Sequence, residues 1–324
     1  MKPNYILSQY RSKLNIEAGK EDPVLDFSKI VDGLDYCYKN GIHMRGHVLV
    51  WHTQVPKWFF NVGYEDDGEY VDAETMEYRL DSFIKQYISF VQFNYPGVVD
   101  VWDVVNEAVE INEGKYDNSA GWYTRSKFNN DPNPWYDVFG VEYPIKAFRI
   151  ARKYALPNVK LVYNDYNTFQ LTPISKRQAI INLINILKKD NLIDGIGMQS
   201  YINPDTSLEE YFEAIEEFQK TGLEIQITEL TIRVSGDEDW EDLQVKQYSE
   251  VFQGIMKYVN QGYNIGSVTV FGLQDGYRFY ESDSTKTRLF DHDLQKKRVY
   301  HAIMETIKSG NDLRNSSDSE SDSE

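Results

Sequence analysis

The sequence of 324 residues is poor in cysteine, in long apolar runs and in positive charge. Cys37 is the only cysteine, which excludes an intrachain disulfide and a metal cluster built on thiolates. No apolar run approaches the roughly 20 residues that a membrane-spanning helix needs. Residues 1–10 also lack the apolar core of a signal peptide. We therefore expect no membrane partner.

Acidic side chains outnumber basic ones, with 51 Asp and Glu against 34 Lys and Arg and a net charge of −17. Nucleic-acid binding depends on clustered Lys and Arg, so this balance argues against nucleic acid as a partner. It also disfavours anionic membrane surfaces and acidic polysaccharides, and favours a neutral substrate. Residues 313–324 form an acidic Ser/Asp/Glu tail that cannot bury a core, and we expect it to be disordered.

Apolar, β-rich runs alternate with amphipathic helical patterns along the chain. The predicted strands are His43–His52, Val98–Glu107, Lys160–Asn167, Gly195–Tyr201, Glu224–Leu230 and Ser267–Leu273. The predicted helices are Phe27–Asn40, Ala73–Asn94, Val138–Tyr154, Ser175–Lys189, Leu208–Lys220, Glu241–Gln261 and Lys297–Ser309. This alternation indicates parallel strands joined by helical crossovers.

Each predicted strand ends in polar or aromatic residues, as the strands of a barrel do at its active face. The sequence therefore predicts an α/β fold of the (β/α)₈ barrel type in one catalytic domain, residues 1–312. Only about six βα units are visible where such a barrel needs eight, so we expect it to be N-terminally incomplete. The segment Ala108–Tyr136 reads as a long polar loop, and loops of that length are usually functional.

Two glutamates follow buried strands. Glu107 ends VDVWDVVNE and Glu229 ends LEIQITE, so a rigid strand delivers each carboxylate to the mouth of the barrel. Glycoside hydrolysis needs two carboxyls on one bond, one protonated and one ionised, about 5 Å apart in a retaining enzyme. At that separation the ionised carboxyl raises the pKa of its neighbour. Each glutamate taken alone would read as an ordinary charge at a strand end.

The contexts of these glutamates narrow the interpretation. Five runs occur in order: GHVLVWHTQVPKWFF (Gly46–Phe60), VWDVVNEA (Val101–Ala108), YNDYN (Tyr163–Asn167), GIGMQS (Gly195–Ser200) and ITEL (Ile227–Leu230). Together they resemble the landmarks of glycoside hydrolase family 10 from about residue 1 to about residue 305. The resemblance implies retaining endo-hydrolysis of β-1,4-xylan in a TIM barrel with no cofactor.

The resemblance also implies roles for individual residues. Glu107 would be the acid/base and Glu229 the nucleophile, and Asn106 would hydrogen-bond the sugar 2-hydroxyl. His52 and Gln199 would line the central subsite, with Trp51 and Trp58 as its wall. Further substrate contacts would come from Lys2, Asn164 and Tyr166.

Several positions depart from the family pattern. Tyr201 stands where the family usually has a His bonded to the nucleophile, and Thr231 where it often has a supporting Asp. Phe271 and Phe279 stand where it usually has two Trp over the cleavage subsite. A tyrosine hydroxyl can still donate to Glu229, so catalysis is not excluded. The alternatives are another β-1,4-glycan as substrate, a catalytically impaired glycan-binding relic, and a structural barrel with relic glutamates.

The front of the chain departs as well. Met1-Lys2-Pro3 resembles the tail of a motif that ends the family's second strand, so two strands are expected to be missing. By family habit we expect secretion, although no signal peptide is visible, and a monomer if the barrel is complete. A zinc site from His43, His47 and His52 is disfavoured, because along a strand the first two face one way and the third the other.

Overall fold

The computed structural model describes residues 2–170, 176–203, 206–234, 239–276 and 286–321, with side chains described as far as Gly310. The chain divides into two compact units. The first comprises Met1–Asp165 and Thr172–Gly195, and the second comprises Tyr166–Leu171 and Ile196–Glu324. In both units parallel strands alternate with helices, which confirms the α/β class.

The first unit is built on three parallel strands in the order β1, β2, β7. Their bounds are Met44–Trp51 for β1, Val99–Asn106 for β2 and Lys160–Asp165 for β7. All three were predicted. Seven of the eight residues of β2 are buried, because helices and neighbouring strands enclose it. The strands are in register at their carboxyl ends, where Trp51 pairs with Asn106 and Asn106 with Asn164.

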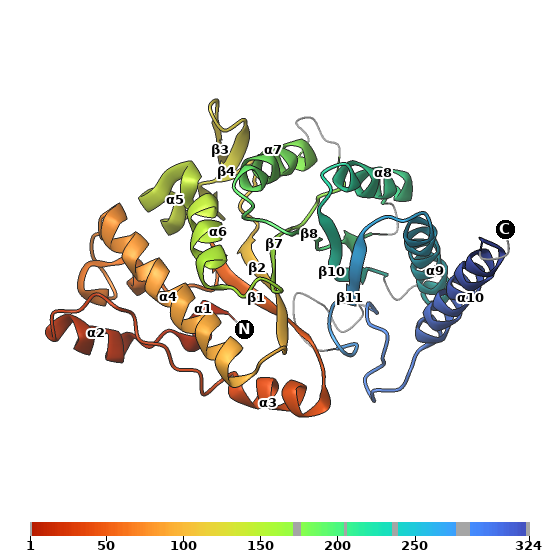
Figure 1. The fold of residues 1–324 in the computed structure, drawn as a ribbon, viewed down its shortest axis with the longest axis horizontal. Helices are drawn as coiled ribbons and strands as arrows, with labels where there is room; N and C mark the ends of the chain where they lie inside the picture. Colours follow the sequence, from red (N-terminus) through yellow and green to blue (C-terminus); the bar gives the residue numbers. More distant parts are fainter. Residues whose placement is uncertain (1, 171–175, 204–205, 235–238, 277–285, 322–324) are drawn as a thin grey trace. The chain divides into compact units, whose positions relative to one another are not determined.

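Helices α4 and α6 lie side by side next to these strands (Figure 1). Helix α4 begins after Asp72, whose side chain accepts a 2.7 Å hydrogen bond from the Thr75 backbone and caps the helix. Its apolar side, including Leu80 and Ile84, is fully buried. The helices of the first unit are α1 (Pro3–Ile6), α2 (Gln9–Glu17), α3 (Val31–Asn40), α4 (Ala73–Asn94), α5 (Pro134–Phe139), α6 (Tyr143–Tyr154) and α7 (Lys176–Lys189). Short 3₁₀ turns are Lys57–Phe60, Val62–Tyr64 and Gly140–Glu142.

The connection Ala108–Tyr136 is more regular than predicted. It contains two antiparallel pairs, β3 (Gly114–Asp117) with β4 (Trp122–Arg125) and β5 (Lys127–Phe128) with β6 (Asp131–Pro132). Polar turn residues explain the first pair. Asp117 accepts hydrogen bonds from the backbone of Ser119 (2.8 Å) and Ala120 (3.0 Å), which closes the turn. The sequence predicted a long polar loop without these strands, because short polar strands show no alternation of apolar and polar residues.

In the second unit the strands run in the order β8, β10, β11, and β9 pairs with β10. Their bounds are β8 (Gly195–Met198), β9 (Tyr201–Ile202), β10 (Glu224–Ile232) and β11 (Ile265–Val270). The chain passes from the first unit to the second within β8. Strand β10 continues past Glu229, contrary to the prediction that Glu229 ends it, because β9 pairs with Thr231 and Ile232.

The helices of the second unit are α8 (Leu208–Gln219), α9 (Trp240–Asn260) and α10 (Arg298–Ser321). Helices α9 and α10 lie side by side (Figure 1). Helix α10 is much longer than predicted and includes most of the acidic segment 313–324. Extending an existing helix costs little per residue, so weak helix formers can follow a packed first half. The disorder of that segment and the domain boundary at residue 312 stay predictions.

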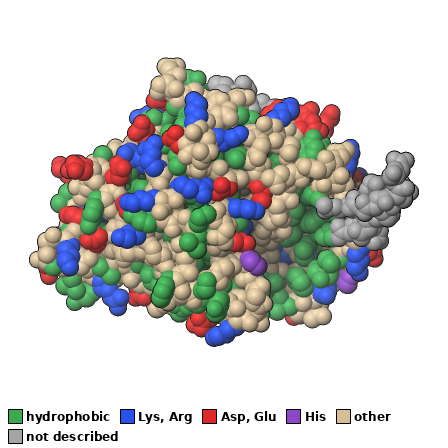
Figure 2. Space-filling view, in the orientation of Figure 1, with side chains coloured by type: hydrophobic (Ala, Val, Ile, Leu, Met, Phe, Trp, Pro, Cys, Tyr) green, Lys and Arg blue, Asp and Glu red, His purple; other side chains and the backbone are tan. Residues whose placement is uncertain are grey.

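Among the described helices, none is long and apolar enough to cross a bilayer. On the face drawn in Figure 2, Lys and Arg side chains are interspersed with Asp and Glu and form no single basic patch. A mixed surface of this kind lacks the positive field that a polyanion would need.

Candidate active site

Three polar or aromatic side chains come to one edge of the first unit because of strand register. Trp51 and Asn106 are the last residues of β1 and β2, Asn164 is the last but one of β7, and the three are paired across the strands. Parallel strands with matched ends place these residues side by side. All three were predicted site residues, and the structure brings them together.

Glu107 follows directly after β2 and is held on several sides. Its carboxylate accepts a 3.0 Å hydrogen bond from Trp51 Nε1, and His52 Nε2 lies 3.9 Å from the same oxygen. Its backbone N–H donates to the Asn164 carbonyl at 2.9 Å, and its own carbonyl accepts from Arg125 Nε at 2.8 Å. The Glu107 side chain is 14% exposed, so it is not fully enclosed by the protein.

Asn106 and Asn164 form a buried amide pair, in which Asn164 Nδ2 donates to Asn106 Oδ1 at 2.9 Å. This bond fixes the orientation of the Asn106 amide. A buried network continues behind the pair. Tyr163 donates to Asp165, and Lys176 Nζ lies 2.7 Å from the other oxygen of Asp165. Burial raises the pKa of Asp165, and the ammonium of Lys176 opposes the shift.

His52 is buried, and neither ring nitrogen has a hydrogen-bond partner among the described residues. Its ring packs on Phe128 with the centroids 4.8 Å apart. Burial lowers the pKa of His52 to about 2, and the cations of Arg125 and Lys176 add to the shift. The imidazole is therefore neutral, so one nitrogen donates and the other accepts. Such a ring suits a sugar hydroxyl, as the prediction for His52 requires.

The other predicted residues of this unit lie in two places. Lys2 Nζ is 5.1 Å from the Trp51 ring centroid, so the start of the chain reaches the end of β1. The Trp51 carbonyl accepts a 3.0 Å hydrogen bond from Trp135 Nε1, which fixes this strand end. Trp58 lies in a 3₁₀ turn, with its ring 5.7 Å from Tyr64. Its role as a subsite wall stays a prediction.

Two of the histidines considered for a zinc site lie beside carboxylates, His43 just before β1 and His47 within it. His43 Nδ1 lies 3.1 Å from Asp100, and His47 Nδ1 lies 3.0 Å from the buried Asp103. In the part of the chain that the structure describes, no three His, Cys, Asp or Glu side chains are grouped as metal ligands.

In the second unit, Glu229 lies in β10 beside the segment that carries Gln199 and Tyr201. The Glu229 N–H donates to the Gln199 carbonyl at 3.1 Å, and the Tyr201 hydroxyl donates to the Glu229 carboxylate. Gln199 is buried, with 2% exposed. The tyrosine therefore provides the hydroxyl donor to Glu229 that the sequence allowed.

Two of the other departures from the family pattern, Phe271 and Thr231, contact Tyr201 and the Glu229 backbone. The Phe271 ring meets Tyr201 edge to face at 6.1 Å, and the Arg288 guanidinium lies 5.2 Å from the Phe271 ring. The Thr231 hydroxyl donates to the Glu229 carbonyl at 3.1 Å. Tyr166 is half-buried in this unit. Phe279 lies outside the described residues.

Arg125 and Asp165 are the contacts that sequence reasoning missed. Arg125 lies in a polar stretch of the long connection, where burial leaves no periodic signal. Asp165 lies within the YNDYN run, so its place beside Asn164 was a usable clue. Both are buried, and a buried charge in a strand-end segment points to a structured site.

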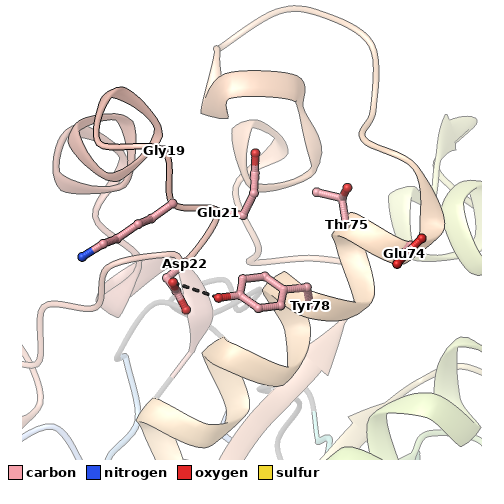
Figure 3. A pocket seen from close by; sticks show the side chains of 7 residues that line it. Gly19, Glu21, Asp22, Glu74, Thr75 and Tyr78 are labelled. Carbon is pink, nitrogen blue, oxygen red and sulfur yellow. Dashed lines mark hydrogen bonds between the residues drawn. The ribbon is translucent and has the colours of Figure 1, made fainter.

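A surface hollow of about 440 Å³ on α4 is separate from these carboxylates (Figure 3). The Tyr78 hydroxyl donates to Asp22 at 3.0 Å, and Glu21 pairs with Arg79 at 2.8 Å. It is lined by Gly19, Lys20, Glu21, Asp22, Glu74, Thr75 and Tyr78. Two of its three carboxylates, those of Glu21 and Asp22, thus have partners within the described residues.

Comparison with known proteins agrees with the geometry. The family whose sequence model matches is glycosyl hydrolase family 10, over residues 1–306. A solved structure of the Clostridium thermocellum endo-1,4-β-D-xylanase 10B, with its CBM22-1 and GH10 modules and xylohexaose, is 32% identical with a TM-score of 0.83. The match covers 93% of this chain and 58% of that one.

Named relatives point the same way. A Caldicellulosiruptor saccharolyticus protein with a provisional endo-1,4-β-xylanase name is 40% identical, over 94% of this chain and 96% of its own length. Endo-1,4-β-xylanase B of Butyrivibrio fibrisolvens is 36% identical over 97% of this chain, which spans 47% of that protein.

Fold and strand-borne carboxylates define a glycoside hydrolase of the TIM-barrel type. The chain belongs to glycosyl hydrolase family 10.

Proposed function

We propose that the protein is a retaining endo-1,4-β-xylanase that degrades plant cell-wall xylan. The observation that carries the proposal is the intact set of strand-borne carboxylates in family context, Glu107 beside Asn106 and Glu229 beside Tyr201. Each carboxylate accepts a hydrogen bond from an aromatic side chain, Trp51 or Tyr201. A relic barrel has no need of either donor.

The reaction proceeds in two displacements. In the first, the Glu229 carboxylate bonds to the anomeric carbon while the bond to the leaving oxygen breaks, and Glu107 gives that oxygen its proton. In the second, Glu107 takes a proton from water, which attacks the same carbon and releases Glu229. The two inversions give net retention.

The surrounding residues bind the sugar. Asn106, with its amide orientation fixed, faces the 2-hydroxyl, and neutral His52 with Gln199 contacts the same sugar. Trp51 and Trp58 offer indole faces to sugar C–H groups. Lys2 extends the glycone side, and Asn164 and Tyr166 lie towards the leaving group. Phe271 gives a smaller apolar surface than a tryptophan.

The test is hydrolysis of an aryl β-xylobioside, with NMR of the first anomer released. We expect the β-anomer first, and no turnover by Glu229→Ala. The matching cellobioside, which carries a hydroxymethyl group on each sugar, tests the alternative of another β-1,4-glycan. Xylan binding without turnover by a folded sample would establish the binding relic instead.

We propose further that the protein acts as a monomer and outside the cell. Both glutamates come from one chain, so catalysis needs no second copy. Polymeric xylan cannot cross a membrane, so its hydrolysis belongs outside. Light scattering of the active sample tests the first point, and xylanase activity in medium against lysate tests the second.

A further inference from the structure

Glu107 has an unusual backbone. Its φ is +57°, in the left-handed region that a residue with a side chain rarely occupies. Such a conformation persists only where its surroundings hold it. Here both polar backbone atoms are engaged, the N–H by the Asn164 carbonyl and the C=O by Arg125 Nε. The end of β7 and the β3–β4 hairpin thus hold the two peptide groups that flank the Glu107 Cα.

Arg125 holds the whole turn after β2. Its Nε donates to the Glu107 carbonyl at 2.8 Å, and its backbone N–H donates to the Ala108 carbonyl at 2.7 Å. Its Nη2 lies 2.9 Å from Glu110 and its Nη1 lies 3.5 Å from Glu113. The side chain is 1% exposed, so these charge-assisted bonds form away from water.

The hairpin that carries Arg125 is itself fixed. The Arg125 carbonyl accepts a 2.9 Å hydrogen bond from Asn133 Nδ2. At the other end of β4, Asn182 of α7 donates to the Gly121 carbonyl at 2.6 Å. Thr124 also bridges to Val109. Because both ends of β4 are tied down, the guanidinium is presented to Glu107 in one orientation.

We infer that Arg125 is a positioning residue for Glu107. Its planar fork holds the Glu107 carbonyl and the Glu110 carboxylate together, which sets the left-handed turn and directs the Glu107 carboxyl to Trp51. The residue thereby controls proton donation to the leaving group. A lysine at this position keeps the charge but cannot reproduce the fork. The inference rests on the proposed role of Glu107 as acid/base.

The experiment compares two substrates that differ in their need for a proton. Xylotetraose has a sugar leaving group that needs the acid, and 2,4-dinitrophenyl β-xylobioside has one that departs without it. We expect Arg125→Lys to lower kcat/KM for xylotetraose by about tenfold to a hundredfold, the cost of a small misplacement of a catalytic group. For the dinitrophenyl substrate the change should be under about threefold.

Arg152→Lys is the matched control. Arg152 likewise holds a backbone carbonyl and a carboxylate, those of Leu192 and Asp194, but away from Glu107. It should react with both substrates as the parent does. Equal losses on both substrates with Arg125→Lys, or no loss on either, would overturn the inference.

Two further variants keep the outcomes separate. If Arg125→Lys does not fold, Glu110→Gln is tested instead, because it weakens the hold on the Arg125 guanidinium without removing Arg125. A smaller loss in kcat/KM that is confined to xylotetraose would support the inference. No such loss would overturn it. Glu107→Ala tests the underlying role. If it shows the substrate difference and the Arg125 variant does not, only the inference fails. If Glu107→Ala loses equally on both substrates, the assigned role of Glu107 fails as well.

Discussion

Glu107 and Glu229 stand in different units, and their surroundings differ in kind. Around Glu107 the partners are the indole of Trp51, the neutral imidazole of His52 and the buried guanidinium of Arg125. Around Glu229 a tyrosine hydroxyl replaces the usual histidine, and a threonine bonds to the backbone. Among the described residues, the departures Tyr201, Thr231 and Phe271 lie in the unit of Glu229, the proposed nucleophile, whereas Glu107, the proposed acid/base, has Trp51 and His52 beside it.

Replacing Glu107 or Glu229 by alanine should have the largest effects on activity, and the two variants should differ in a way that distinguishes the roles of the two glutamates. Glu229→Ala should lose activity by about 10⁴- to 10⁶-fold, because no covalent intermediate can form. Glu107→Ala should lose about 10²- to 10⁴-fold in kcat/KM for xylotetraose, the usual share of general acid–base catalysis, and much less for the dinitrophenyl substrate. The measurement is azide rescue with the dinitrophenyl xylobioside. A β-azide from Glu107→Ala and an α-azide from Glu229→Ala support the assignment, and the same anomer from both contradicts it.

Tyr201→Phe should lower activity by affecting Glu229, the proposed nucleophile, and not Glu107. It removes the hydroxyl that donates to Glu229 and keeps the ring against Phe271. A hydrogen bond to a charged group is worth about 1.5–3 kcal/mol, which corresponds to about a tenfold to a hundredfold loss in kcat/KM. Because the nucleophile acts on every substrate, xylotetraose and the dinitrophenyl xylobioside should lose alike. Tyr201→His, the usual family residue, serves as the control and should retain activity.

The buried His52 should make the stability of the folded protein depend on pH. Its pKa is about 2 in the folded protein and about 6.5 when unfolded, so below pH 6.5 the unfolded chain binds the extra proton. Stability is therefore present above pH 6.5 and is lost as the pH falls. The loss should reach about 3 kcal/mol at pH 4. Urea unfolding of His52→Asn should show a shallower pH dependence than the parent over this range; parallel curves would contradict the shift.

Gly114→Ala should displace the hairpin that carries Arg125. An added Cβ would lie 1.9 Å from the Glu110 carbonyl oxygen and 3.0 Å from that of Thr124, both backbone atoms. Overpacking of this kind costs about 2 kcal/mol, measured by urea unfolding. Gly266→Ala in the second unit is the control. Its Cβ would meet the end of the flexible Glu224 side chain, which can move aside, so its effect should be smaller.

Much of the fold and of the candidate site was predictable from the sequence. The six strands were predicted because their sequences are short, β-rich apolar runs, and Glu107 was predicted because it closes one of them. The hairpins of residues 114–132 and the extension of β10 to Ile232 were not, since they depend on pairing partners. The burial of Arg125 was hidden as well. Its partners Glu107, Glu110 and Glu113 meet it only after the chain folds back.

The register that aligns Trp51, Asn106 and Asn164 across three strands limits which changes of sequence length these strands can tolerate. Successive side chains of a strand alternate between faces, so deleting one residue within β2 would turn Asn106 away from both neighbours at once. We therefore expect insertions and deletions to be tolerated better in the connections between strands than within the strands. Substitutions such as Tyr201 or Phe271 leave this alignment untouched. We therefore expect the lengths of the strands in the first unit to be conserved. In the second unit we expect single side chains, such as those at positions 201 and 271, to vary.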